Sequence, residues 1–430
     1  MNLRPPCTID AQKTRFPPGG GFFYRLEVSV KGLTTDKMLH ALRGAGLLLP
    51  FHDWLVELRR HFHQYPELAC KEEKTAEKIA EVLGELGIPF RSGIGGTGTV
   101  AEIRAQRPGP ALGLRTDMDA LPLQEKTDVP YRSRRPGIMH ACGHDAHMAI
   151  ALGTARLLVE NRWAQRGAGK IILIFQPAEE SGAGARAMLE SGTFGAEALE
   201  AIFAAHMHPE LTSGQIGVTG EISNAASDNF VIRITGKGGH GAHPHLCIDP
   251  IVAGAHLVTQ IQTIASRVVS PLDSAVVTVA KFHAGSARNI IPEEAFLEGT
   301  IRTLRPEVRQ AVLKRLEQLA VGLERAHGVT CELRLLDGTP ALSNDAGLAG
   351  YAFRLASDLL GPENVRIEQP RMGAEDFACF AQRWPAVLIR LGCRKPGTEY
   401  SHGLHSPWFD LDETVLDVGV RLFAALLEKF

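Results

Sequence analysis

The chain contains 430 residues, of which 44% are hydrophobic and 22% are charged, and its formal net charge is -2. This length exceeds the usual limit of a single hydrophobic core, so we expect two domains. The near-neutral charge, without a block of Lys or Arg, argues against a nucleic-acid partner, and no apolar run is long enough to span a membrane. The seven cysteines are scattered and no secretory signal pattern is present, so we expect a cytoplasmic protein without a disulfide framework.

Residues 1–45 contain proline and glycine clusters and no sustained hydrophobic periodicity. We therefore expect an irregular N-terminal extension there, with Met38 as an alternative start. Beyond it, hydrophobic spacing predicts alternating helices and strands, which is typical of a largely parallel sheet covered on both faces. The predicted helices are 54–62, 75–86, 148–159 and 183–191, and the predicted strands are 99–103, 111–114, 170–175, 201–205 and 215–218.

The pattern changes near residue 221, where a β-α-β-β-α-β order begins. This order predicts a split βαβ, ferredoxin-like α+β unit with its helices on one face of the sheet. Because the α/β pattern resumes near Asn344, we predict an inserted domain at 222–336 within a first domain formed by 46–221 and 337–430. The predicted strands of the insertion are 229–235, 275–282, 295–303 and 329–336, and its predicted helices are 248–266 and 308–326.

The segment 139–147, MHACGHDAH, places one thiol, three imidazoles and a carboxylate among small residues. Thiolate sulfur and imidazole nitrogen are ligands that transition metals prefer. A glycine at 143 would let Cys142 and His144 turn toward one point where a loop enters a helix. The alternative is a buried cysteine beside capping and surface polar groups.

Several other segments place acids or histidines at the predicted ends of strands, where open α/β sheets bind ligands. Glu179 and Glu180 follow one strand, and beside a Cys/His cluster one carboxylate can bind metal while the other moves a proton. The alternative for this pair is an exposed acidic helix start. The other candidates, for which capping or structural roles are the alternative, are Asp117, Asp119, His206 and His405.

Three polar residues of the predicted insertion are also candidates. His240 lies in a glycine-rich loop and could donate a hydrogen bond to a developing oxyanion. The same loop could form a phosphate-binding nest, but the Lys-Ser/Thr of a P-loop does not follow it. Asn289 is a further polar candidate, and Arg302 lies either on a solvated strand face or in a carboxylate clamp.

Taken together, these segments resemble the M20 metallopeptidase family. Within it the chain is similar to the amidohydrolase branch of hippurate hydrolases, N-acyl-amino-acid deacylases and plant auxin-conjugate hydrolases. Other M20 branches have His-x-Asp at 117–119 and a bridging aspartate in place of Cys142, whereas His208 stands where relatives often carry a bulky apolar residue and receives no role. The resemblance covers about 46–430 and is carried by 60–61, 65–68, 115–122, 140–145, 176–180, 239–240, 373–377 and 404–407.

The resemblance implies a catalytic domain that binds two divalent metal ions and is interrupted by a lid domain that also dimerises. Glu179 falls at the position of the general acid/base, and Asp119 at that of a supporting carboxylate. His240 matches a lid histidine that reaches a neighbouring subunit's active site, while Asn289 and Arg302 resemble residues that hold the substrate's carbonyl and carboxylate. The metal ligands that the resemblance implies are Cys142, His144, Glu180, His206 and His405.

The resemblance implies an amidohydrolase that cleaves N-acyl amino acids of the hippurate, N-acetyl or auxin-conjugate type. Two ions (Mn, Zn, Co or Ni) would polarise the amide carbonyl and activate a water. We expect a homodimer, with a tetramer as the alternative. Other substrates open to the same fold are N-acyl diaminopimelates and small dipeptides. Two alternatives of another class are a metal-free hydrolase with Cys142 as nucleophile and a non-catalytic metal-binding protein, although the latter has no need of Glu179.

Overall fold

The computed structural model describes residues 49–430, so the extension predicted at 1–45 lies outside the described residues. Its larger sheet has the strand order β1-β2-β4-β3-β5-β16-β6-β15. Four of the neighbouring pairs are parallel (β3 with β4 and β5, β5 with β16, and β6 with β15), and the other pairs are antiparallel. This confirms the predicted mixed, mostly parallel α/β sheet. The strands are β1 (Phe90–Ile94), β2 (Gly98–Arg104), β3 (Arg107–Asp117), β4 (Ala168–Gln176), β5 (Ala201–Thr212), β6 (Ile216–Val218), β15 (Val365–Ile367) and β16 (Ala386–Arg394).

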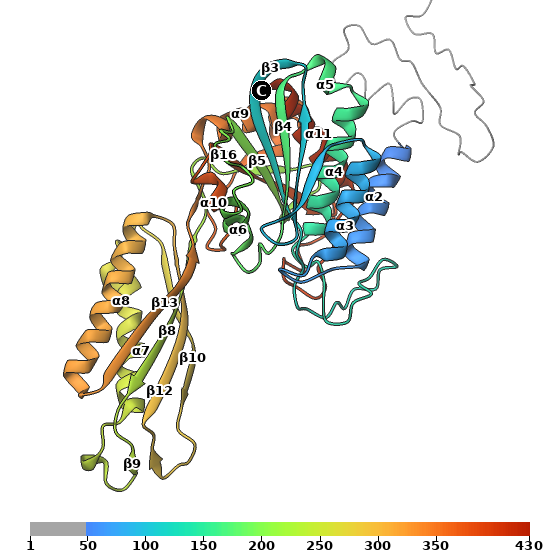
Figure 1. Cartoon of the computed structure of the whole chain (residues 1–430). Coiled ribbons are helices and arrows are strands. Elements are labelled where there is room, and N and C mark those ends of the chain that lie inside the picture. Colours follow the sequence, from blue (N-terminus) through green and yellow to red (C-terminus); the bar gives the residue numbers. More distant parts are fainter. Residues whose placement is uncertain (1–48) are drawn as a thin grey trace, which may run out of the picture. The chain divides into compact units, whose positions relative to one another are not determined.

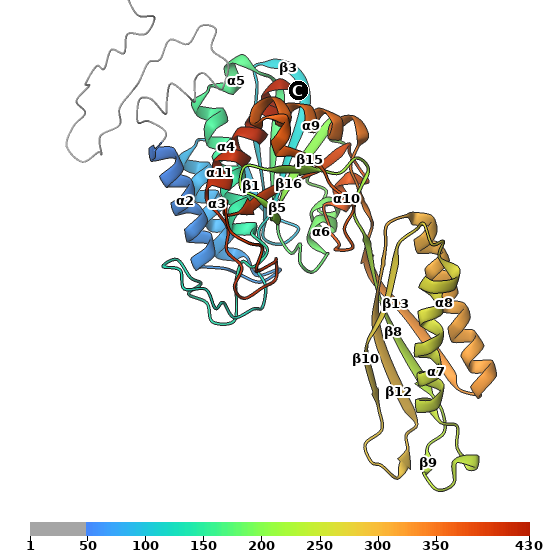
Figure 2. The same cartoon turned by 180° about the vertical axis from the view of Figure 1, so that it is seen from behind.

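Helices cover both faces of this sheet (Figures 1 and 2). The long apolar helix α4 is almost completely buried because it lies between the sheet and α11. On the other face, Met188 and Phe380 pack against Ile172 and Ile174 of β4 in one core cluster. The helices are α2 (Leu49–Gln64), α3 (Glu73–Glu85), α4 (His144–Glu160), α5 (Trp163–Arg166), α6 (Gly184–Glu190), α9 (Ala346–Leu360), α10 (Ala378–Ala381) and α11 (Thr414–Lys429).

A second, four-stranded antiparallel sheet has the order β10-β12-β8-β13, with α7 and α8 on one face (Figure 2). Burial alternates along β8, where Phe230, Ile232 and Ile234 face the two helices. This arrangement is the predicted split βαβ unit, although β13 continues beyond residue 336. The elements are β8 (Ala226–Thr235), α7 (Pro250–Thr263), β10 (Ala275–Ala284), β12 (Glu294–Thr303), α8 (Pro306–His327) and β13 (Thr330–Thr339).

Two short ribbons complete the strands. β7 (Ile222–Asn224) pairs with β14 (Leu342–Ser343) where the chain enters and leaves the four-stranded sheet, and β9 (Gly239–His240) pairs with β11 (Ile290–Ile291). None of the described helices is long and apolar enough to cross a membrane. The cysteines among the described residues are all free, as their scattered positions predicted.

One strand prediction is wrong in a way that affects the site. The run predicted at 201–205 is the first part of β5, which continues to Thr212 because β16 pairs with it as far as Arg394, the partner of Thr212. His206 and His208 therefore lie inside a strand and not at its end. Polar residues stop an apolar run in the sequence, but they do not stop the backbone pairing that a neighbouring strand provides.

Candidate metal centre

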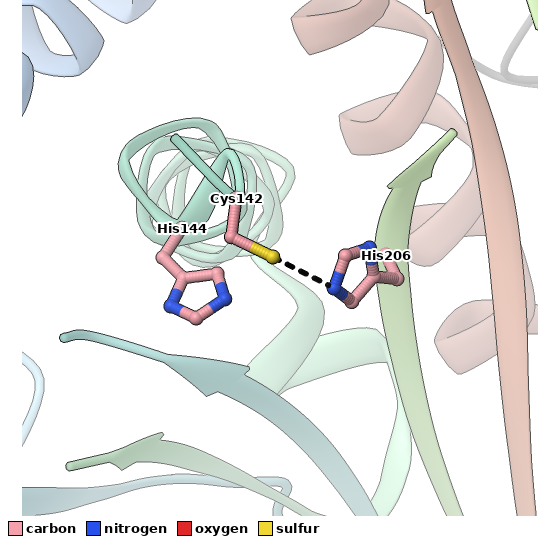
Figure 3. Close-up of side chains that lie close together, drawn as sticks. All are labelled: Cys142, His144 and His206. Carbon is pink, nitrogen blue, oxygen red and sulfur yellow. Dashed lines mark hydrogen bonds between the residues drawn. The ribbon is translucent and has the colours of Figure 1, made fainter. Parts of the chain in front are cut away.

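The candidate residues meet where β3, β4 and β5 approach the N-terminus of α4. Among the described residues, three of the five sets of donor atoms that lie within 4.8 Å of one another are formed by the implied ligands and Glu179, and Cys142 belongs to two of these three. Its Sγ lies 3.4 Å from Nε2 of His206 (Figure 3). His405 Nε2 lies 3.3 Å from Oε1 of Glu180. The sets are Cys142 with His144 and His206, Cys142 with Glu180 and His405, and His144 with Glu179 and Glu180.

Gly143 allows Cys142 and His144 to face the same point. It precedes the first residue of α4 with a φ of 83°, in the left-handed region that side chains disfavour. A Cβ added there would lie 2.6 Å from Cγ of Met207 on β5. Both the turn and the close approach of α4 to β5 therefore require glycine, as the sequence predicted for the turn.

We expect Gly143→Ala to destabilise the protein by about 2 to 4 kcal/mol, from the left-handed backbone and the overpacked Cβ together. Gly137→Ala is a matched control, because Gly137 has a φ of +75° and nothing within 4 Å of an added Cβ. Thermal unfolding should show the larger loss for Gly143→Ala, with weaker metal binding in chelator competition. Equal losses in the two variants would mean that the contact with Met207 is unimportant.

Hydrogen bonds fix which ring nitrogens face the cluster. Nδ1 of His144 donates to the carbonyl oxygen of Asp119 at 2.8 Å, and Nδ1 of His206 donates to that of Met207 at 2.9 Å. The Nε2 lone pairs of both rings are then directed to the cluster. Nε2 of His144 is buried without a hydrogen-bond partner. Because such atoms rarely remain unsatisfied, this donor set fits a bound cation.

The other two histidines of the 139–147 segment are not among the implied ligands, although both ring nitrogens of the buried His140 also lack a hydrogen-bond partner. Nδ1 of His147 donates to Asp117 at 2.7 Å, and its Nε2 accepts from the backbone N–H of Met207 at 2.8 Å. Both nitrogens of His147 are therefore occupied. His140 is fully buried, and burial lowers its pKa to about 3, but it belongs to none of the donor sets.

Asp119 holds the backbone of Glu179 and Glu180 in place. Its carboxylate oxygens each accept a backbone N–H at 3.0 Å, one from Glu179 and one from Glu180. The preceding residue, Ala178, has a φ of 53°, and its N–H donates to the buried Glu72 at 2.9 Å. The strained turn that presents both glutamates is thus held by two acids. Sequence reasoning did not identify Glu72, whose position at the start of a helix gave no signal.

Glu179 also belongs to an acidic group with Glu375 and Asp376. The carboxylate oxygens of these three residues lie within 4.8 Å of one another. Burial and these neighbours raise its pKa well above the usual value, which favours a carboxyl that can hold a proton. The buried Arg115 is 3.0 Å from both Glu375 and Asp376, and it donates to Asp117 at 2.9 Å. From the sequence, residues 115 and 373–377 served only as motifs that carry the family resemblance. The contact of Arg115 with Glu375 and Asp376 depends on the tertiary fold, so the sequence does not show it.

The geometry disfavours Cys142 as a metal-free nucleophile. Burial and nearby carboxylates raise the pKa of its thiol well above the usual value. Burial and neighbouring rings lower the pKa of His206 to about 3, so this imidazole is a weak base. An activated cysteine needs a stabilised thiolate, which the raised pKa of Cys142 disfavours even though Asp117 and Asp119 raise the pKa of the neighbouring His144 to about 10.

A cavity of about 960 Å³ adjoins the cluster. Arg302 of β12 lines it together with Cys142 and Glu179. His240 and Asn289 are not among its lining residues. They lie at the β9–β11 ribbon, where His240 is exposed and accepts a hydrogen bond from the N–H of Ala242 at 3.0 Å. Within one chain, therefore, Arg302 lines the same cavity as the cluster, whereas His240 and Asn289 do not.

Residues 113–429 match the family model of peptidase family M20/M25/M40, and the chain belongs to this family. N-acetylcysteine deacetylase of Bacillus subtilis (strain 168) is 40% identical over 381 residues, which cover 87% of this chain and 96% of that protein. IAA-amino acid hydrolase ILR1-like 4 of Arabidopsis thaliana is 35% identical over 384 residues, which cover 88% of this chain and 86% of that protein. The Bacillus subtilis YXEP protein, described as a dinuclear metal-binding peptidase, is 36% identical with a TM-score of 0.75, over 88% of this chain and 97% of that one.

The family membership and the donor sets together define the class of the protein. It is a metal-binding hydrolase of the M20 amidohydrolase branch that acts on amide bonds. This confirms the resemblance and the reaction class inferred from the sequence. The identity of the metal, the substrate and the role of each residue are proposals.

Proposed function

We propose that this protein releases free amino acids from N-acyl amino acids. The observation that carries the proposal is a set of sulfur, nitrogen and oxygen donors placed directly beside a buried carboxyl, Glu179, at the edge of one cavity. The deacetylase and the auxin-conjugate hydrolase that the chain resembles support this substrate class. N-acyl diaminopimelates and small dipeptides are the substrates that the same site would take if this class is wrong.

We propose that the site binds two divalent ions, which would be Mn, Zn, Co or Ni. The five proposed ligands belong to the three donor sets described above. When bound, the ions would supply Lewis acidity for the amide carbonyl and lower the pKa of a water. Cys142 would have to lose its proton, which bound metal promotes. The ligands are Cys142, His144, Glu180, His206 and His405.

Glu179 would accept the proton of the attacking water and return it to the leaving amine. Its raised pKa suits the second step, because the carboxyl must hold the proton until the amine departs. Asp119 does not face the substrate in this scheme. It positions Glu179 and Glu180 by accepting both of their backbone N–H groups. Arg302, which lines the cavity, would meet the carboxylate of the amino acid.

The test is hydrolysis of a panel of N-acetyl, N-benzoyl and indole-acyl amino acids by chelated protein, before and after each metal is added back. We expect release of free amino acid only with metal. N-acyl diaminopimelates and dipeptides belong in the same panel. Turnover of those substrates alone would contradict the N-acyl-amino-acid proposal, while turnover without metal would contradict the metal-dependent reaction.

We further propose that the protein is a cytoplasmic homodimer in which His240 and Asn289 serve the partner's site. His240 is exposed and lies outside the cavity of its own chain, so a role in binding the oxyanion requires a second subunit. Mixing inactive Glu179→Gln with inactive His240→Ala should restore about a quarter to a half of the activity after subunit exchange. No restoration in a proven mixed dimer would contradict the shared site.

A further inference from the structure

The cavity wall next to His206 carries positive charge that the proposed reaction does not use. Arg390 of β16 lies opposite His206 in the parallel register with β5. His208 follows His206 by two residues, so it points to the same side of the sheet about 7 Å farther along the strand. Arg371, in the segment between β15 and α10, donates to Nε2 of His208 at 2.9 Å. All four side chains line the cavity.

Arg390 is a buried cation whose hydrogen-bond partners are carbonyl oxygens. Its guanidinium is 4% exposed and donates to the carbonyl oxygens of Gln369 at 2.9 Å and Ser223 at 3.0 Å. The nearest carboxylate, that of Glu368, lies 3.7 Å away. The partners within hydrogen-bond distance are thus neutral carbonyl oxygens, which leaves the guanidinium able to pair with a further negative charge.

His208 accepts a hydrogen bond from Arg371 and thereby positions that guanidinium in this wall. Because Arg371 donates to its Nε2, the proton of the ring lies on Nδ1. The wall thus offers two guanidinium groups to a ligand, and His208 holds one of them in place.

The carboxylates near these groups do not face the cavity. Glu210 forms a two-pronged ion pair with Arg371, and Glu368 lies near Arg390, but neither glutamate lines the cavity. The side chain of Glu210 is 49% exposed, so its pair with Arg371 is solvated and weak. A carboxylate that entered the cavity could therefore share Arg371 without displacing a buried partner.

We propose that His208, Arg371 and Arg390 form a subsite for a second carboxylate of the substrate, separate from the one that would meet Arg302. The inference rests on the proposed function and narrows it to N-acyl amino acids with an additional negative charge. The planar fork of arginine matches a carboxylate through two parallel hydrogen bonds. A distance of about 7 Å from His206 suits either an acidic amino-acid side chain or a dicarboxylic acyl group such as succinyl.

The test uses substrate pairs that differ only in this charge. One pair is N-acetylglutamate and N-acetylglutamine, and the other is N-succinylalanine and the amide of its succinyl group. We expect kcat/KM of the metal-loaded protein to favour the acid about 10- to 100-fold in at least one pair, as for a charge-assisted hydrogen bond. The preferred pair shows whether the second carboxylate belongs to the amino acid or to the acyl group.

Arg371→Gln should bring this acid-to-amide ratio close to one, mainly through a higher KM for the acid. The side chain of Arg371 is 38% exposed, which makes this replacement easier to accommodate than one at Arg390. Arg366→Gln is the matched control, because Arg366 is an exposed arginine of neighbouring β15 that does not line the cavity. The control should keep the wild-type ratio.

Equal kcat/KM for acid and amide in both pairs would overturn the subsite and leave the proposed amidohydrolase in place. A preference for the acid that survives Arg371→Gln would also overturn it, because the selectivity would then come from other groups. Hydrolysis of no member of either pair, nor of any other N-acyl amino acid, would overturn the proposed function and the subsite together.

Discussion

Replacement of Glu179 by glutamine should lower kcat by about 10²- to 10⁴-fold, the usual contribution of a general acid/base. Glutamine keeps the size of the side chain but cannot accept the proton of a water. The backbone N–H of residue 179 should still donate to Asp119, so the local turn is preserved. The measurement is kcat with the best substrate of the panel, together with the metal content of the purified variant.

Two ions per chain in Glu179→Gln, with turnover lost, would separate a hydrolase from a protein that only binds metal. Glu190→Gln is a suitable control, because Glu190 also lines the cavity but lies outside the donor sets. Near-normal turnover in Glu179→Gln would contradict the assigned role and would direct attention to Glu375, which lies in the same acidic group.

Replacement of Cys142 by alanine should weaken metal binding by at least about 100-fold and reduce turnover accordingly. The thiol belongs to two of the donor sets, so its loss affects both proposed ions, and an altered supporting residue alone costs 10- to 100-fold. Alanine fits at this position without a clash, because only the sulfur is removed. Metal affinity by chelator competition and turnover at saturating metal are the two measurements.

Cys379→Ala provides the control, because Cys379 is a buried free thiol in α10 that lies outside the donor sets. It should keep both metal affinity and turnover. If Cys142→Ala lost turnover but retained both ions at wild-type affinity, the thiol would act in the chemistry. That result would revive the cysteine-hydrolase alternative, as would inactivation by iodoacetamide that added metal does not affect.

The sequence was most informative where the chemistry is local. The Cys-Gly-His spacing at 142–144 predicted a turn into a helix, and the structure has that turn, with α4 starting at His144. The β-α-β-β-α-β order predicted the four-stranded sheet because each element has a clear hydrophobic period. Fold class therefore followed from patterns that short segments carry by themselves.

The parts that the sequence could not give depend on contacts between distant segments. His206 lies within β5 because β16 extends the pairing, and no pattern near residue 206 shows this. The link from Arg115 to Asp376 spans 261 residues, and that from Glu72 to Ala178 spans 106. Acids and arginines of this kind look like solvated surface residues until the fold buries them.

The most direct test of the account is a titration of the chelated protein with metal, in which bound ions per chain and hydrolysis of an N-acyl amino acid are followed together. The account predicts that chelated protein is inactive and that turnover rises with binding and reaches its plateau at two ions per chain. Full turnover by protein shown to be free of metal would contradict it, as would two bound ions without hydrolysis of any amide.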